Sequence, residues 1–201
     1  PGARASGALP PGFVWFAIGA FLLIAGSQPL YSWVVAYLEQ SLDASPGVAG
    51  GVSAVASAIG IAVMVVNALR TDRIGADHRV RRIVILLAAN LVGTLLVLAG
   101  ATWGIGVAVV GTILGISAQL SAIGTMHAAV VDRAPGAVAR ATGLTMTGYY
   151  LGALVSPAAF GALADITDTF AWSWAATAVL LGLAIPAWIR AGRVAPATTD
   201  R

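Results

Sequence analysis

Long apolar runs alternate with short polar segments along the whole chain. A helix rises about 1.5 Å per residue and the hydrocarbon core of a bilayer is about 30 Å thick, so about 20 apolar residues suffice to cross it. Six runs meet this condition, and we expect transmembrane helices at about 13–38, 47–69, 83–101, 104–131, 139–164 and 170–190. A membrane β-barrel would instead show alternating strands of about ten residues. The pattern therefore predicts an all-α integral membrane protein, built as a six-helix transmembrane bundle.

The segments outside these runs are short. Residues 1–12 are rich in Pro, Gly and Ala, and we expect a flexible linker there. Residues 194–201 are expected to form a cytoplasmic tail. The chain begins at Pro1 without a methionine, which indicates a truncated N-terminus. The first apolar run is too long for a secretory signal, so we expect it to remain in the protein as an anchor.

The composition is typical of a chain that is solvated mainly by lipid. Of the 201 residues, 59% are hydrophobic and only 9% are charged, which is outside the usual range of soluble domains. The absence of cysteine excludes disulfides, thiolate nucleophiles and thiolate metal sites, and we expect neither a cofactor nor a metal. The basic residues are dispersed between the apolar runs, so we expect no nucleic acid partner.

Charged residues divide sharply between alternate connections. The connections after the first and fifth spans carry acidic residues and no arginine: Glu39, Asp43, Asp165 and Asp168. All eleven basic residues are arginines at the termini or after the second, fourth and sixth spans: Arg4, Arg70, Arg73, Arg79, Arg81, Arg82, Arg133, Arg140, Arg190, Arg193 and Arg201. Because an excess of basic residues marks cytoplasmic loops, we expect a multi-pass protein of the cell inner (cytoplasmic) membrane with both termini in the cytoplasm.

Three local patterns resemble a known transporter family. The connection after the second span, residues 67–82, contains an Asp-Arg pair, a glycine and a basic run. The connection after the fourth span has the order acid, Pro, Arg, Gly over residues 132–143, and the fifth span combines small residues with a proline over residues 148–161. In this order the patterns resemble the C-terminal six-helix half of the major facilitator superfamily, and the resemblance covers residues 13–193.

The resemblance implies a particular fold and function. That family has two six-helix bundles around a central cavity, each made of two inverted three-helix repeats. This chain would supply one bundle, and a missing N-terminal six-helix half would supply the other. The implied function is secondary active transport or facilitated diffusion of a small solute by alternating access, with multidrug or metabolite efflux as one form. The implied partners are a small-molecule substrate, the lipid bilayer and the missing half.

Polar side chains inside apolar spans are the candidates for solute binding, because such groups are costly against lipid. In the first span, Gln28, Tyr31 and Ser32 share one helical face, and Pro29 beside them predicts a local kink. Helix packing is the alternative explanation for this polar face.

Further cavity candidates lie in the first, fourth and fifth spans: Trp33, Gln119, Thr145 and Tyr149. If the two helix triplets are related by inverted repetition, Gln28 and Gln119 fall at similar depth near the membrane midplane. An interhelical hydrogen bond is the alternative for Gln119, and close packing is the alternative for the fifth span.

Small and aromatic residues predict how the helices pack and where they end. We expect close helix contacts at the glycines of the second, fourth and fifth spans: Gly60, Gly111, Gly115, Gly148 and Gly152. All six tryptophans fall toward predicted span ends, where indoles anchor at the membrane interface: Trp15, Trp33, Trp103, Trp172, Trp174 and Trp188.

The cytoplasmic motif suggests a gate rather than a coupling site. Asp72, Arg73, Gly75 and Arg140 are the gating candidates, with Asp72 pairing with Arg140 or Arg73 in one conformational state; a solvated turn is the alternative. Apart from Arg140 and Arg190 at the span ends, the predicted spans contain no Asp, Glu, Lys or Arg, and His127 is their one candidate for proton coupling.

Other functions fit the sequence less well. An intramembrane hydrolase would need a nucleophile and a base with flanking residues that Ser117 and His127 lack, so we expect no enzymatic activity. A self-assembling six-helix channel and an ABC-type permease subunit remain the alternatives to a transporter half.

Overall fold

The computed structural model describes residues 8–73 and 75–194, except for the side chains of residues 72, 76 and 77. The described chain folds into helices with no strand, in the order α1 (Val14–Ser27), α2 (Pro29–Ser32), α3 (Val34–Ser41), α4 (Pro46–Arg73), α5 (Ala76–Trp103), α6 (Ile105–Arg133), α7 (Val138–Thr167) and α8 (Phe170–Gly192). Helices α1 to α3 follow the first predicted span, and each later helix follows one span. The prediction of six apolar helices long enough to cross a membrane is confirmed.

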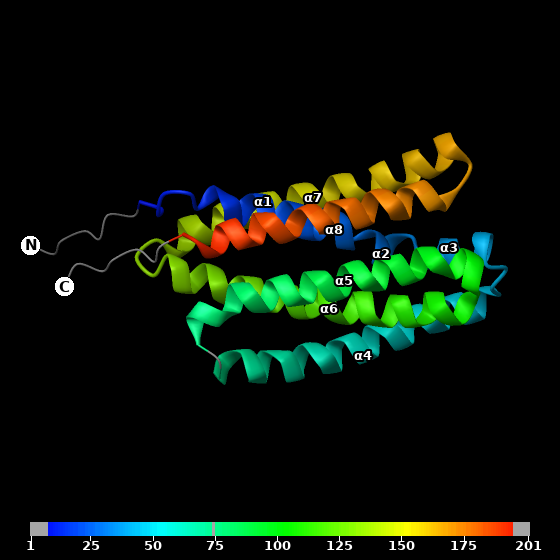
Figure 1. Cartoon of the computed structure of the whole chain (residues 1–201), viewed down its shortest axis with the longest axis horizontal. Helices are drawn as coiled ribbons and strands as arrows, with labels where there is room; N and C mark the ends of the chain where they lie inside the picture. The colour runs from blue at the N-terminus through cyan, green and yellow to red at the C-terminus, as the bar shows by residue number, and fades with distance from the viewer. Residues whose placement is uncertain (1–7, 74, 195–201) are drawn as a thin grey trace, which may run out of the picture.

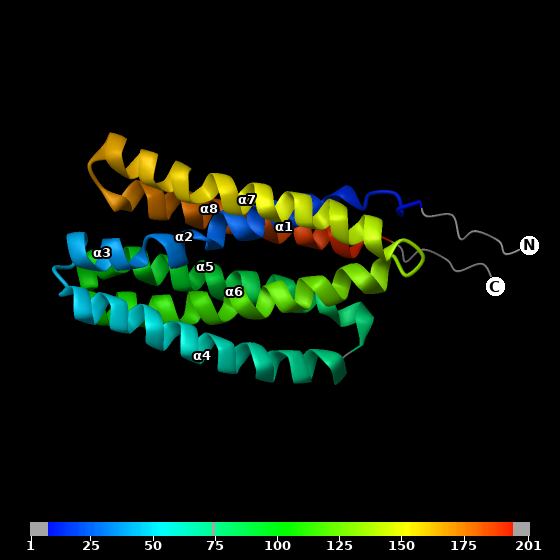
Figure 2. The ribbon, with the colours of Figure 1, turned by 180° about the vertical axis from the view of Figure 1, so that it is seen from behind.

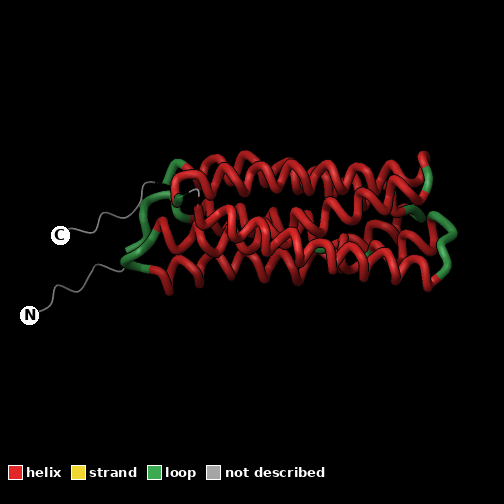
Figure 3. The backbone as a smooth tube through the Cα atoms, turned by 90° about the horizontal axis from the view of Figure 1, so that it is seen from below, coloured by secondary structure: helices red, strands yellow, loops and turns green. Residues whose placement is uncertain are grey.

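The helices run along the long axis of the molecule, and the connections gather at its two ends (Figure 3). Figure 1 and Figure 2 show α1, α7 and α8 on one side of the bundle and α4, α5 and α6 on the other. The first span therefore packs against the last two helices, whereas α6 packs against α4 and α5. The first three spans form one sequential triplet and the last three form the other. The first helix of each triplet packs against the second and third helices of the other triplet, an arrangement that fits two three-helix repeats.

The interior contains two apolar clusters that lie one above the other along the helices. One cluster includes Phe16, Leu23 and Trp188, and the other includes Leu30 and Trp174. Between them, five helices each place buried polar residues: Ser27, Asn90, Thr94, Gln119, Ser156 and Thr177. We call these residues the buried polar layer.

Closely packed glycines join the helices within each side. A Cβ on Gly148 or Gly152 of α7 would overlap the backbone of α1, and a Cβ on Gly111 of α6 would lie 2.5 Å from the Gly93 carbonyl oxygen of α5. Gly115 fits against Leu30 in the same way. The predicted packing role of these glycines is confirmed. Because a larger side chain would force the backbones apart, these glycines set the distances between helices.

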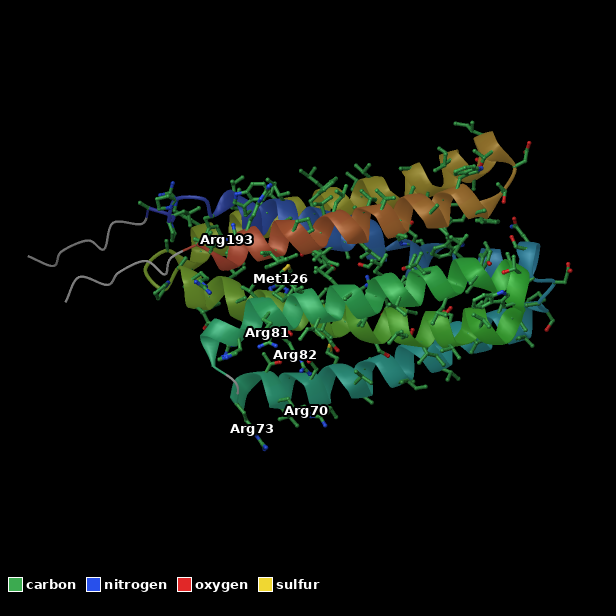
Figure 4. All side chains as sticks on the ribbon, viewed as in Figure 1. Arg70, Arg73, Arg81, Arg82, Met126 and Arg193 are labelled. Atoms are coloured by element: carbon green, nitrogen blue, oxygen red, sulfur yellow. The ribbon has the colours of Figure 1, made fainter. Side chains whose placement is uncertain are left out.

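The two ends of the bundle differ in charge. All nine arginines of the described residues lie at the end that holds both described chain ends, and we call it the arginine-rich end. Figure 4 labels five of these arginines there. Trp103 and Trp172 are exposed at the opposite end, as predicted for interfacial anchors. The prediction was wrong for Trp174 and Trp188, which are 0% exposed in the core.

Candidate functional site

The first span is broken in its middle, as Pro29 predicts. Pro29 has no backbone N–H, so the carbonyl oxygen of Ala25, four residues earlier, lacks the donor that a regular helix would supply. The hydroxyl of Ser156 on α7 donates to the Ala25 carbonyl oxygen at 2.6 Å and replaces that donor. A second break follows at Trp33, where φ is −126°. The kink is thus a built feature of the span, stabilised by a neighbouring helix.

Trp33 ties the second break to the same helix. Its indole Nε1–H donates to the Pro157 carbonyl oxygen at 2.9 Å. The ring packs against Phe160 and Phe170, with centroids 5.7 and 6.3 Å apart, and Gly161 leaves room for it. Trp33 was predicted as a cavity residue, but in the structure its contacts are those of a packing residue. Two consecutive residues of α7 therefore hold the broken span on both sides of the kink.

The polar face of the broken span is partly open. Gln28 and Tyr31 are partly buried and Ser32 is exposed, with the Ser32 hydroxyl donating to the Gln28 carbonyl oxygen at 3.4 Å. Helix α2, which carries Tyr31 and Ser32, packs against α7, which carries Tyr149. Tyr149 of α7 is also partly buried. The structure thus places four predicted cavity residues at the junction of α1 and α2, on α2 and on the adjacent α7, and we call these four residues the open polar face.

Thr145 lies elsewhere on α7. Its side chain is 0% exposed, and its hydroxyl donates to the Ala141 carbonyl oxygen of its own helix at 2.9 Å. It belongs to the same buried stripe as Gly148, Gly152 and Ser156, which contact α1. The structure assigns Thr145 to helix packing rather than to the open polar face.

Gln119 lies inside the bundle. Its side chain is 2% exposed, and its Oε1 has no hydrogen-bond partner among the described residues. Gln119 belongs to the buried polar layer on α6, one turn from Gly115, where the structure also places the carboxamide oxygen of Asn90. Gln28 is partly exposed, whereas Gln119 is internal, and no hydrogen bond between the two glutamines is described. A shared role of Gln28 and Gln119 in solute binding stays a prediction.

A polar network at the arginine-rich end joins α4, α5 and α6, and it was not predicted from the sequence. Arg82 donates through Nε to Asn67 Oδ1 at 2.8 Å, and Asn67 Nδ2 donates to Thr125 Oγ1 at 3.1 Å. Arg79 forms an ion pair with Asp132 at 2.8 Å. One signal was present: Asn67 and Arg82 lie at nearly equal distances from the connection between two antiparallel helices, which places them opposite each other.

The predicted gating residues flank this network. Arg73 and Arg140 are exposed, and Gly75 precedes α5 with a φ of 74° and a ψ of 165°. The side chain of Asp72 lies outside the described residues, so the pairing of Asp72 with Arg140 or Arg73 stays a prediction. Exchanging the charges of Asp72 and Arg140 tests that pairing, because the double variant should recover function that each single variant loses. His127 is exposed on α6.

These features define a multi-pass membrane bundle with a broken, polar first span. A family model described as Major Facilitator Superfamily matches residues 16–201, most of the chain. The chain therefore belongs to the major facilitator superfamily, whose members are membrane transporters, and the resemblance seen in the sequence is confirmed. No curated protein and no solved structure matches the chain. Membership of this family favours transport over the channel and ABC-type alternatives.

Proposed function

We propose that this chain transports a small neutral or amphipathic solute by alternating access, as one of two six-helix bundles with both termini in the cytoplasm. Family membership supports membrane transport of a small solute. We propose in addition a second six-helix bundle, cytoplasmic termini and a neutral or amphipathic solute. The concentration of arginines at one end supports the orientation, since basic loops are retained in the cytoplasm.

The observation that carries the proposal is the polar break in the first span. Discontinuous helices form binding sites in many transporters, because they expose polar groups near the membrane midplane. Here Gln28 keeps helical backbone angles beside Pro29, the helix is interrupted at Trp33, and the polar side chains between them are partly open. No other helix of the described residues is interrupted within its apolar span.

The open polar face suits a solute without strong charge. Gln28 offers both a donor and an acceptor through its carboxamide, and Ser32 offers a hydroxyl. Tyr31 and Tyr149 add aromatic rings with phenol groups, which bind surfaces that are apolar on one side and polar on the other. None of the four carries a charge at neutral pH. Neutral or amphipathic molecules therefore fit this set of side chains best.

The contacts of α7 suggest how the face moves. Ser156 and Trp33 link the broken span to α7 on both sides of the kink. Gly148 and Gly152 bring the two backbones into direct contact. In the proposal, α1, α2 and α7 rock as one body, and the open polar face turns with them from one side of the membrane to the other.

Transport by the complete protein in proteoliposomes tests the proposal. A panel of radiolabelled neutral, amphipathic, cationic and anionic solutes is offered first, and uptake of a neutral or amphipathic solute is expected. Gln28→Ala should then reduce transport of that solute while the protein stays folded. Thr147→Ala, an exposed change on α7, is the matched control and should transport normally. Uptake restricted to strongly charged solutes, or unchanged kinetics in Gln28→Ala, would contradict the proposal.

A further inference from the structure

A groove opens between α4 and α5 near the arginine-rich end. Its cavity volume is 340 Å³. The wall is apolar, with Val63 and Val66 from α4 and Leu86 from α5, and Arg70 and Arg82 lie at its head. Figure 4 shows Arg82 beside the start of α5 and Arg70 on the last turns of α4. The groove is separate from the open polar face on α1, α2 and α7.

The groove exists because α4 and α5 scarcely touch. Helix α4 packs against α6 and α3, and α5 packs against α6 and α8. The hydrogen bond from Arg82 to Asn67 spans the gap between α4 and α5. Val63 and Val66 are therefore 40% and 47% exposed on the side of α4 that faces the groove. The apolar wall of the groove is therefore exposed within the membrane-spanning part of the helices, where another apolar group can pack against it.

Among the described residues, no acidic side chain neutralises the two arginines, Arg70 and Arg82, at one end of the groove. Arg82 uses Nε to bind Asn67, and no partner is described for its two terminal nitrogens. Arg70 makes no hydrogen bond or ion pair with the described residues. The carboxylate of Asp132 is already paired with Arg79. Over residues 70–82 the sequence has five arginines against two aspartates, so the head of the groove favours an anion.

We propose that this groove binds one anionic phospholipid. Guanidinium groups bind phosphate through two parallel hydrogen bonds, so Arg70 and Arg82 would hold the phosphate. The acyl chain would lie along Val63 and Val66, which are exposed, and Leu86, which is partly buried beside them. Basic pockets between transmembrane helices are sites of this kind. A free phosphate ion would leave the apolar wall uncovered, and a helix of the second bundle would leave the two arginines without an anion.

The affinity of short-chain phosphatidylglycerol for the purified complete protein tests the proposal. Dioctanoyl-phosphatidylglycerol is titrated against the protein in detergent, with dioctanoyl-phosphatidylcholine as the neutral-headgroup probe, and the bound lipid is counted by native mass spectrometry. One phosphatidylglycerol should bind more tightly than phosphatidylcholine. Each basic residue near an anionic lipid contributes about 1 kcal/mol, so Arg70→Gln should weaken binding about fivefold and Arg70→Gln with Arg82→Gln about 25-fold.

Two further variants separate this site from general surface charge. Arg193→Gln removes one charge at the same end but outside the groove, and it should leave the affinity unchanged. Val66→Trp fills the apolar wall without changing any charge, and it should weaken binding of phosphatidylglycerol. Because the side chain of Val66 is exposed, this variant should fold even if the double arginine variant does not.

Three results would overturn the proposal. The first is equal binding of phosphatidylglycerol and phosphatidylcholine. The second is an equal loss of affinity in Arg193→Gln and Arg70→Gln, which would indicate attraction to the whole surface. The third is unchanged affinity in Val66→Trp, which would show that no acyl chain occupies the groove. Failure of transport in any variant does not bear on this test, since only lipid binding is measured.

Discussion

Replacing Gly152 by alanine tests how closely α1 and α7 pack. The added Cβ would lie 2.5 Å from Ile24 Cγ2 and 2.7 Å from the Phe21 carbonyl oxygen. Favourable carbon–oxygen contacts need about 3.3 Å, so the two helices must separate by about 0.6 Å. A gap of about 0.5 to 1 Å forfeits a quarter to a half of the dispersion energy of the atoms beside it. Overpacking of this kind costs about 1 to 3 kcal/mol.

Gly143→Ala is the matched control on the same helix. A Cβ at Gly143 would meet no atom within 4 Å. Both substitutions gain the same helix propensity, about 1 kcal/mol, so the difference between them isolates the cost of forcing the helices apart. Gly152→Ala should therefore be less stable than Gly143→Ala by about 1 to 3 kcal/mol.

Thermal unfolding followed by tryptophan fluorescence measures this difference in the detergent-purified protein. For a chain of this size, 1 kcal/mol shifts the Tm by about 2 to 4 °C. The Tm of Gly152→Ala should therefore lie about 2 to 12 °C below that of Gly143→Ala. Equal Tm values would refute the close contact between α1 and α7, and with it the proposal that these helices move as one body.

Three further predictions concern individual polar and backbone features. Ser156→Ala removes the donor to the Ala25 carbonyl oxygen and should lower stability by about 0.6 to 1.7 kcal/mol in the same unfolding assay. Arg79→Gln and Asp132→Asn should each destabilise the protein, and a double-mutant cycle should give a coupling energy of about 0.5 to 1 kcal/mol. Gly75→Ala should cost about 1 to 3 kcal/mol, because its φ of 74° and ψ of 165° belong to a region that is essentially restricted to glycine.

Each of these predictions has its own control. Thr147→Ala removes a hydroxyl that bonds to a carbonyl oxygen of its own helix. An equal loss of stability in Thr147→Ala and Ser156→Ala would argue against a stabilising hydrogen bond from Ser156 to α1. Additive effects of the two charge substitutions would show that Arg79 and Asp132 do not interact. Gly136→Ala changes a turn glycine with no steric neighbour and no positive φ. An equal loss of stability in Gly136→Ala and Gly75→Ala would indicate that the backbone conformation of Gly75 does not cause the loss.

Features that depend on position along the chain could be predicted from the sequence. The number of apolar helices follows from the length of the apolar runs, and the gathering of arginines at one end follows from their alternation between connections. The kink at Pro29 follows from the missing N–H. The donor that replaces it, Ser156, lies 127 residues later in the sequence, and only the packing of α7 on α1 brings it there.

Features that depend on which side of a helix a residue occupies could not be predicted. In lipid, apolar side chains cover both the inner and the outer faces of a helix. Hydropathy therefore predicts how deep a residue lies in the membrane, but not whether it faces the bundle interior or the lipid. Trp174 and Trp188 are near span ends in sequence but point into the core. Gln119 points into the buried polar layer for the same reason. Gln28, Tyr31 and Ser32 were predicted to share a face from their spacing alone, and their role in solute binding stays a prediction.

Protection of a thiol at position 32 by the solute tests whether the open polar face binds the transported solute. The 201 residues contain no cysteine, so Ser32→Cys introduces a single thiol at an exposed position of the open polar face. Its rate of maleimide labelling is measured in the reconstituted complete protein, made free of other cysteines, with and without the solute identified by transport. We expect the solute to slow labelling of Ser32→Cys and to leave the labelling rate of Thr102→Cys, an exposed position at the end of α5, unchanged. Equal labelling rates of Ser32→Cys with and without a transported solute would contradict this expectation.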